Sequence, residues 1–305
     1  MIFVTGTKRS GTSMWMQILI EAGFPYIGEP YPRNWVKSIQ NANKEGFYES
    51  SLRKGVYHQT NPNPKTGAYL FPQNTRRHVL KVFIPGLVRS DIGFIDNVVG
   101  TIRPWREYVQ SIRRLYEMED SHLATLATPE GRTLSPLEHA RLMRGDLHPA
   151  LEWWMENYDL IRNFITRRFA FNLVSYQKLL DDPSGVIPPV IEWCGGGDVD
   201  KAVAAVRPKL NTQKDIRSIV DSPLTSAQER IFDELHRHFY DQVPLRASFI
   251  EELNAVDEVL RPLILEQRAK GLKRLQDALR AVGHTEDSVQ NISAQQEDLQ
   301  NDMGF

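Results

Sequence analysis

The chain of 305 residues contains 41% hydrophobic and 25% charged residues, carries a formal net charge of -1 at pH 7, and has one cysteine. This balance excludes a disordered or collagen-like chain. A single cysteine, Cys194, excludes an internal disulfide and a metal cluster built from cysteines. The near-neutral charge provides no basic footprint over the whole chain, so we expect no nucleic-acid partner.

The first residues predict a buried strand. Residues 2–5 are apolar or β-branched and end at Gly6, as expected for a strand covered on both faces of a parallel sheet. Three more runs predict strands, at 79–84 (stopped by Pro85), 98–102 and 171–176. Helical spacing of apolar residues lies between the strands, at 12–22, 105–118, 150–168 and 186–194. This alternation predicts an α/β fold with a mainly parallel sheet.

Two polar segments, 59–76 and 119–148, predict long surface loops that could include short helices. The second is a candidate lid over an acceptor, because Trp153 and Trp154 follow it directly. We expect an α/β domain over 1–249, a charged helical extension over 250–283 and a mobile tail over 284–305.

No run approaches the ~20 apolar residues that a membrane-spanning helix requires, so we expect no transmembrane segment. The chain opens on a strand pattern, without the basic start and apolar run of a signal peptide. We therefore expect a cytoplasmic protein.

The segment from Gly6 to Ser13 lies between the first predicted strand and the first predicted helix. Its glycines, Gly6 and Gly11, stand five apart as in a phosphate-binding P-loop, but Thr12 occupies the position of the P-loop lysine. Backbone N–H groups at such a helix start favour an anion, and Arg9 adds a fixed charge with a planar fork of donors. The pattern predicts a phosphate or sulfate site.

The run Lys8-Arg9-Ser10-Gly11-Thr12-Ser13 resembles the 5′-phosphosulfate loop of sulfotransferases that use 3′-phosphoadenosine 5′-phosphosulfate (PAPS). A second stretch resembles the 3′-phosphate motif of the same family, in which an arginine ends a strand and a serine follows eight residues later. Arg103 and Ser111 match it in type and spacing. The resemblance implies a three-layer α/β fold like that of P-loop NTPases, PAPS as co-substrate, and no metal.

Weaker similarities follow in the same order along the chain. Gly46-Phe47-Tyr48-Glu49 is similar to a glycine–aromatic–glutamate element of many bacterial members, and the stretch 174–183 resembles a third family segment whose tyrosine lies near the adenine. The resemblance covers about residues 1–220. It implies PAPS-binding roles for Lys8, Arg9, Ser10, Gly11, Thr12, Ser13, Arg103, Ser111 and Tyr176.

The catalytic base departs from the family pattern. Cytosolic members carry a lysine–threonine–histidine sequence in the strand before the 3′-phosphate motif, and this chain has Lys81-Val82-Phe83. Lys81 is kept, but Phe83 cannot accept a proton. Branches of the family that use glutamate instead suggest Glu29 first and Glu49 second.

Two histidines and one tryptophan also concern differences from the family pattern. His58 and His148 are reserve candidates for the base. Relatives carry an adenine-stacking tryptophan where this chain has Met14; Trp15 is one position further on, about 100° round the helix.

The resemblance implies transfer of a sulfuryl group from PAPS to a hydroxyl or amine acceptor, with Arg9 and Lys81 on the transferred group and a glutamate as base. One alternative is a protein that binds PAP, the desulfated product, without catalysis. Another is a nucleotide kinase, which would need a lysine at position 12 and an acidic magnesium ligand at a strand end. The acceptor could be a small molecule, a glycan or a peptide. The helices of 250–282 could pair between chains or pack back on their own sheet.

Overall fold

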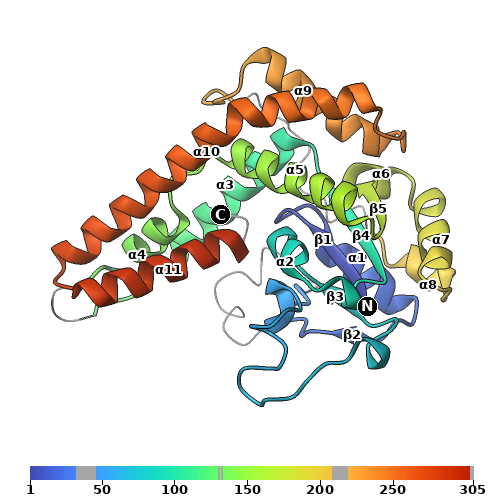
Figure 1. The fold of residues 1–305 in the computed structure, drawn as a ribbon, viewed down its shortest axis with the longest axis horizontal. Coiled ribbons are helices and arrows are strands. Elements are labelled where there is room, and N and C mark those ends of the chain that lie inside the picture. Colours follow the sequence, from blue (N-terminus) through green and yellow to red (C-terminus); the bar gives the residue numbers. More distant parts are fainter. Residues whose placement is uncertain (32–45, 130, 132, 208–218, 303–305) are drawn as a thin grey trace.

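A five-stranded sheet forms the centre of the protein. The computed structural model describes residues 1–31, 46–129, 131, 133–207 and 219–302. The strands are β1 (Ile2–Gly6), β2 (Tyr26–Ile27), β3 (Val79–Lys81), β4 (Asn97–Ile102) and β5 (Ala170–Ser175), in the order β2-β3-β1-β4-β5. All four pairings between neighbouring strands are parallel (Figure 1).

Helices connect the strands and extend beyond them. They are α1 (Thr12–Glu21), α2 (Ile84–Arg89), α3 (Trp105–Leu123), α4 (Pro136–Arg144), α5 (Pro149–Arg167), α6 (Tyr176–Asp181), α7 (Pro183–Trp193), α8 (Val199–Ala204), α9 (Ser226–Tyr240), α10 (Ala247–Ala281) and α11 (Glu286–Asp302). None of the helices in these described residues is both long and apolar enough to cross a membrane.

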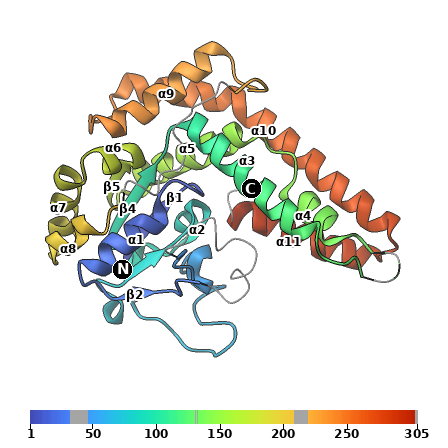
Figure 2. The ribbon, with the colours of Figure 1, turned by 180° about the vertical axis from the view of Figure 1, so that it is seen from behind.

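Alternate residues of the strands supply two cores, one on each face of the sheet. Ile2 and Val4 of β1 pack with α1, α7 and α8, whereas Phe3 packs with α2 and with Leu160 of α5 on the opposite face. This alternation is the period of two that a strand imposes. The views from the front and from behind show the resulting three layers (Figure 2). The predicted three-layer α/β class, like that of P-loop NTPases, is confirmed.

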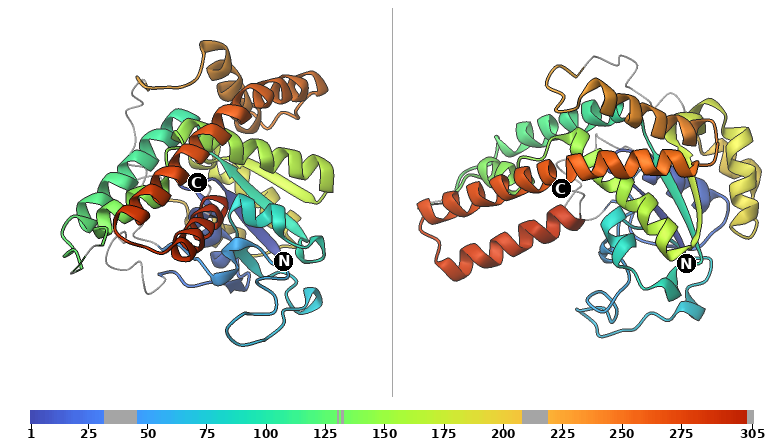
Figure 3. Two further views of the ribbon diagram at one scale, coloured as in Figure 1. Left: turned by 60° about the vertical axis from the view of Figure 1, so that its left-hand side comes forward. Right: turned by 45° about the horizontal axis from the view of Figure 1, so that its top comes forward.

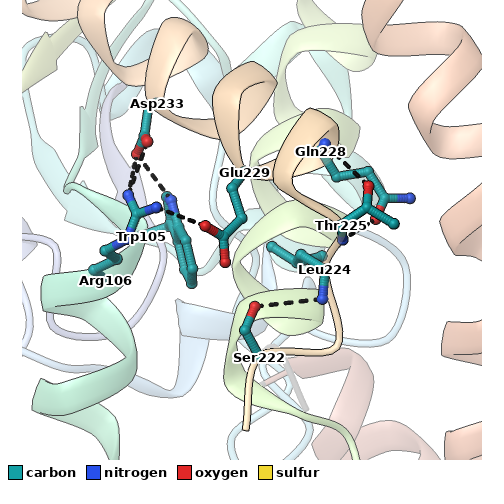
Figure 4. A network of polar contacts seen from close by, with 8 residues as sticks. All are labelled: Trp105, Arg106, Ser222, Leu224, Thr225, Gln228, Glu229 and Asp233. Atoms are coloured by element: carbon teal, nitrogen blue, oxygen red, sulfur yellow. Dashed lines mark hydrogen bonds and ion pairs between the residues drawn. The ribbon is translucent and has the colours of Figure 1, made fainter. Parts of the chain in front are cut away.

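A third core holds α9 and α10 against α3 and α5. Trp153, Trp154 and Phe232 are fully buried there, with Phe232 stacked on both tryptophan rings. Polar contacts fix α9 at the start of α3: Arg106 donates to Asp233 and Glu229, and the indole of Trp105 also donates to Asp233 (Figure 4). The helix that follows Arg103 is therefore anchored in place.

Helices α10 and α11 form a hairpin that reaches past α4 (Figure 3). Leu275, Leu279 and Val289 are buried between these helices, and Gln296 donates to the carbonyl of Leu142 in α4. The sequence favours only weak helical tendency in 284–305, yet 286–302 is helical because it packs on these neighbours. The domain boundaries themselves stay a prediction.

Several predicted elements change their limits. The strand expected over 79–84 ends at Lys81, because helix α2 begins at Ile84 with Pro85 in its first turn, where a proline is well tolerated. The polar segment 119–148 contains the end of α3 and all of α4, whose start has a Ser135–Glu138 capping box. The helical region 225–282 divides into α9 and α10.

Candidate functional site

The loop between β1 and α1 turns sharply at two residues. Arg9 has φ 63° and Gly11 has φ 103°, both in the left-handed region. Side-chain bonds hold the turn: the Ser10 hydroxyl donates to the carbonyl of Thr7 (2.6 Å), and Thr101 of β4 donates to the carbonyl of Ser10 (2.8 Å). A non-glycine residue with positive φ is strained, and this strain is tolerated because the surrounding bonds fix the loop.

The start of α1 is open to an anion. Its N-cap is Gly11, no side chain caps it, and its first turn contains no acidic residue. Thr12 and Ser13 are the first two residues of the helix, so their hydroxyls lie beside the uncapped backbone N–H groups. Such a helix start attracts phosphate and sulfate groups through its N–H donors and its dipole.

The two motifs that lie about a hundred residues apart in the sequence meet in space. The Arg9 Nε donates to the Ser111 hydroxyl at 3.3 Å, and an Arg103 guanidinium nitrogen donates to the carbonyl of Arg9 at 3.1 Å. Arg103 is buried and also pairs with Glu107 at 3.0 Å, one turn into α3. Arg9, Arg103 and Ser111 therefore share one location at the carboxyl end of the sheet.

Tyr176 covers the loop from the side of β5. Its ring lies so close to Gly11 that a Cβ there would come within 2.4 Å of the ring. The Arg103 guanidinium lies over the same ring, 5.1 Å from its centre. Burial raises the pKa of the Tyr176 hydroxyl, while Arg103 and Arg9 oppose the rise. The tyrosine thus borders the arginine pair.

Lys81 lies on the other flank of the loop. It is two residues after Val79, whose side chain packs with α1, so Lys81 shares that face of β3. Its ammonium donates to the Ser13 hydroxyl (3.3 Å), to the carbonyl of Phe47 (2.9 Å) and to Glu49 (3.3 Å). Glu49 also accepts from Arg53 at 2.8 Å.

The cations around the loop are desolvated. Burial lowers the pKa of Lys8, Arg9 and Lys81; neighbouring Arg103 lowers that of Arg9 further, whereas Glu152 opposes the shift at Lys8 and Glu49 opposes it at Lys81. Removing cations from water costs free energy, and an anion bound among them would offset that cost. The uncapped helix start and the buried cations therefore suit an anion.

The candidates for the base occupy different surroundings. Glu29 is exposed and pairs with Glu49 only through the two backbones, whereas Glu49 is buried beside Lys81. His58 is exposed. His148 caps α5 by accepting from the N–H of Ala150, and burial together with Arg113 lowers its pKa. Of these candidates, the structure brings only Glu49 to the loop.

The aromatic departures are structural. Phe83 is buried in the turn from β3 to α2, where its N–H donates to the carbonyl of Arg53. Trp15 is fully buried in the core beneath α1. Phe83 therefore does not replace the family's histidine, and Trp15 does not replace the adenine-stacking tryptophan.

Sequence reasoning missed three buried carboxylates near the site: Glu107, Glu152 and Glu156. Glu107 could have been found from its i, i+4 spacing to Arg103. The spacing of Glu152 and Glu156 was also informative, since two glutamates four apart occur within an otherwise apolar and aromatic helical stretch. Glutamates are rarely buried, so a buried glutamate indicates a specific role.

Acidic groups are not arranged for a metal in the part of the chain that the structure describes. No group of three or more His, Cys, Asp or Glu side chains there could hold a metal ion. Asp96 lies before β4, at the opposite edge of the sheet from the loop, and pairs with the amino group of Met1 at 2.6 Å.

The fold was compared with those of solved protein structures. The chain is similar to the sulfotransferase domain of the olefin synthase from Synechococcus PCC 7002, with 14% identity and a TM-score of 0.39, over 86% of this chain and 94% of that domain. No family model and no curated protein matches the chain. Function is therefore argued from the residues of the site.

Proposed function

We propose that this protein is a sulfotransferase that moves a sulfuryl group from PAPS to a hydroxyl or amine acceptor and releases PAP. The observation that carries the proposal is the meeting of Arg9 with Ser111 and Arg103 beside Tyr176. An ordinary P-loop binds a 5′-phosphate chain with its own residues. A second arginine and serine, contributed by β4 and α3, suit a second phosphate group such as the ribose 3′-phosphate of PAPS.

Each group of site residues would bind a different part of PAPS. Arg9 and the N–H groups at the start of α1 would hold the 5′-phosphosulfate, with Thr12 and Ser13 adding hydroxyl donors. Arg103 and Ser111 would grip the 3′-phosphate, and Tyr176 would border the adenosine. PAPS supplies the activated sulfuryl group.

Lys81 is the group that favours catalysis over binding alone. Its ammonium lies at Ser13, next to the uncapped start of α1, and Glu49 together with the Phe47 carbonyl holds it there. A preorganised cation at the transferred group stabilises charge that develops as the bond to the leaving phosphate breaks. A protein that only binds PAP has no need for this charge.

A nucleotide kinase is less well supported. Thr12 occupies the position of the P-loop lysine, and Asp96 lies at the wrong edge of the sheet to hold Mg²⁺ beside the loop.

Transfer of labelled sulfate from PAPS to panels of phenols, sugars, amines and peptides tests the proposal. We expect one panel to be labelled by the wild type. Arg9→Ala should lower the rate by roughly 10²-fold or more, as removal of one charge-stabilising donor does. Arg113→Ala is the matched control, since Arg113 lies on α3 but pairs with Asp221. Binding of PAP without labelling of any panel would favour the non-catalytic alternative.

A further inference from the structure

Helix α5 carries two buried carboxyl groups whose charges act on Lys8. Lys8 belongs to the phosphate loop, the segment between β1 and α1 (residues 7–11). Glu152 and Glu156 are 3% and 4% exposed and lie one turn apart, on the same face of the helix. The start of α5 is fixed at the site, because the indole of Trp153 donates to the carbonyl of Arg103 at 2.8 Å. Glu152 is the residue before Trp153, and its charge acts on Lys8 of the loop.

Groups from several elements face this pair. They are Lys8 from the phosphate loop, Tyr108 and Tyr116 from α3, Arg268 from α10, and Asp159 near Glu156. Glu119 from α3 and Arg144 from α4 (over the Tyr116 ring at 4.6 Å) act on Tyr116, and Arg261 pairs with Asp159. Lys8 connects the pair to the site, because it belongs to the loop. Among the neighbouring carboxylates, Glu152 has the largest electrostatic effect on the pKa of Lys8.

Burial favours the protonated form of both carboxyl groups. Burial raises the pKa of Glu152 to about 7, against the opposing influence of Lys8, Tyr108 and Arg268. Burial, and then the charge of Glu152, raise the pKa of Glu156 well above its usual range. Burial thus favours the neutral form of Glu156. Near pH 7 Glu152 is close to half ionised, the condition under which a carboxylate both accepts and returns a proton efficiently.

One oxygen of Glu152 is available. Its Oε1 is buried and has no hydrogen-bond partner among the residues that the structure describes. Glu49 differs, since its two oxygens accept from Lys81 and from Arg53. Glu49 is thus an anchor for Lys81, and Glu29 is exposed.

We propose that Glu152 is the base of the transfer reaction, with the acceptor bound beside its unpartnered Oε1. The inference rests on the proposed function. The acceptor oxygen or nitrogen forms a bond to sulfur while the bond from sulfur to the phosphate oxygen breaks. The electron pair of that bond stays on PAP, and the acceptor proton passes to the Glu152 carboxylate, which later returns it to water. Burial favours the neutral form of Glu156, which limits the negative charge beside Glu152.

Two measurements on the full chain test this proposal. The first is calorimetric titration with PAP near pH 7 in buffers of different ionisation enthalpy. An anion bound beside Lys8 and Glu152 favours the protonated carboxyl, so the wild type should take up more protons on binding than Glu152→Gln does. PAP affinity should stay within a few-fold in that variant. Comparison between the two proteins cancels the titration of the phosphates of PAP itself.

The second measurement is the pH profile of PAP release from PAPS with water as acceptor. The wild-type rate should fall below an apparent pKa near that of Glu152, about 7. Glu152→Gln should lose this acid limb and fall by roughly 10²-fold or more, with KM for PAPS little changed. Glu152→Asp should retain the limb at a lower rate. Glu117→Gln, an exposed glutamate of α3, should behave as the wild type.

The outcomes separate the two proposals. If the wild type does not bind PAP, the sulfotransferase proposal itself fails. If PAP binds with the same proton uptake in wild type and Glu152→Gln, or if the acid limb persists in Glu152→Gln and disappears in Glu49→Gln, Glu152 is not the base.

Discussion

Lys8 belongs to the phosphate loop and Lys81 lies beside it, and each is close to buried glutamate, but the charges on the two flanks of the loop are arranged in opposite ways. On the α1 flank, Glu49 sits between Lys81 and Arg53, so one carboxylate meets two cations. On the α5 flank, two carboxyls meet Lys8 and Arg268, and burial raises the pKa of both. On the first flank Glu49 holds the Lys81 cation in place, and on the second burial favours a protonated carboxyl group. Group transfer with proton removal needs both, and the loop between them is where they would act.

The largest expected effect comes from breaking the first flank. Lys81→Met should lower the rate of sulfuryl transfer by roughly 10²–10³-fold, because the cation beside Ser13 is lost from the transferred group. PAP affinity should change little, since PAP lacks that group. Rates and PAP titrations on the same preparations check the split. An equal loss of PAP affinity would place Lys81 on the nucleotide instead.

The second flank should make stability depend on pH. Glu152 goes from the ordinary value of 4.5 in the unfolded chain to about 7 in the folded one. Between these values the folded state binds more protons, so stability falls as pH rises from about 4.5 through 7, by up to roughly 3 kcal/mol. The raised pKa of Glu156 contributes a change of the same sign.

Urea unfolding of wild type, Glu152→Gln and Glu156→Gln at several pH values measures this slope. Each glutamine variant should flatten it and be at least as stable as the wild type at the alkaline end. Unchanged slopes in both variants would show that the pair does not store protons.

Gly11→Ala should disturb the loop between the flanks. The new Cβ would come within 2.4 Å of the Tyr176 ring, at a φ of 103° that alanine disfavours. We expect a loss of about 1–3 kcal/mol in unfolding free energy and weaker PAP binding. Gly23→Ala is a matched control for the backbone alone, since its φ is 93° and its Cβ would meet no atom within 4 Å. Similar losses in both variants would leave Tyr176 without a role.

The smallest effect should follow Arg53→Ala. Arg53 is 26% exposed, so its bond to Glu49 contributes about 0.5–1 kcal/mol to stability, while Lys81 keeps its contact with the carboxylate. Thermal unfolding and the transfer rate check this together. A large loss of rate would mean that Arg53, and not Lys81, organises Glu49.

The sequence was sufficient for the parts of the molecule that follow local rules. The buried strand at 2–5, the glycine loop and the helix after it have short-range signatures. Arg103 and Ser111 were predicted from the resemblance of their stretch to the 3′-phosphate motif of the sulfotransferases. The contacts between Arg9 and Ser111, and between Lys81 and Glu49, depend on strand order, which no local pattern reveals. Glu152 was missed because its role arises from burial against α3 and α10, elements far away in the sequence. Tertiary packing likewise turned the weakly helical 286–302 into α11.

Calorimetric titration with PAP and with AMP tests the central claim most directly, because the two ligands differ by the 3′-phosphate. Wild type should bind PAP far more tightly than AMP, and Ser111→Ala should lose roughly tenfold in PAP affinity with AMP affinity unchanged. Arg113→Ala, two residues further along α3, should match the wild type for both ligands. Equal binding of PAP and AMP by the wild type would contradict the assignment of Arg103 and Ser111 to a 3′-phosphate, and with it the sulfotransferase proposal.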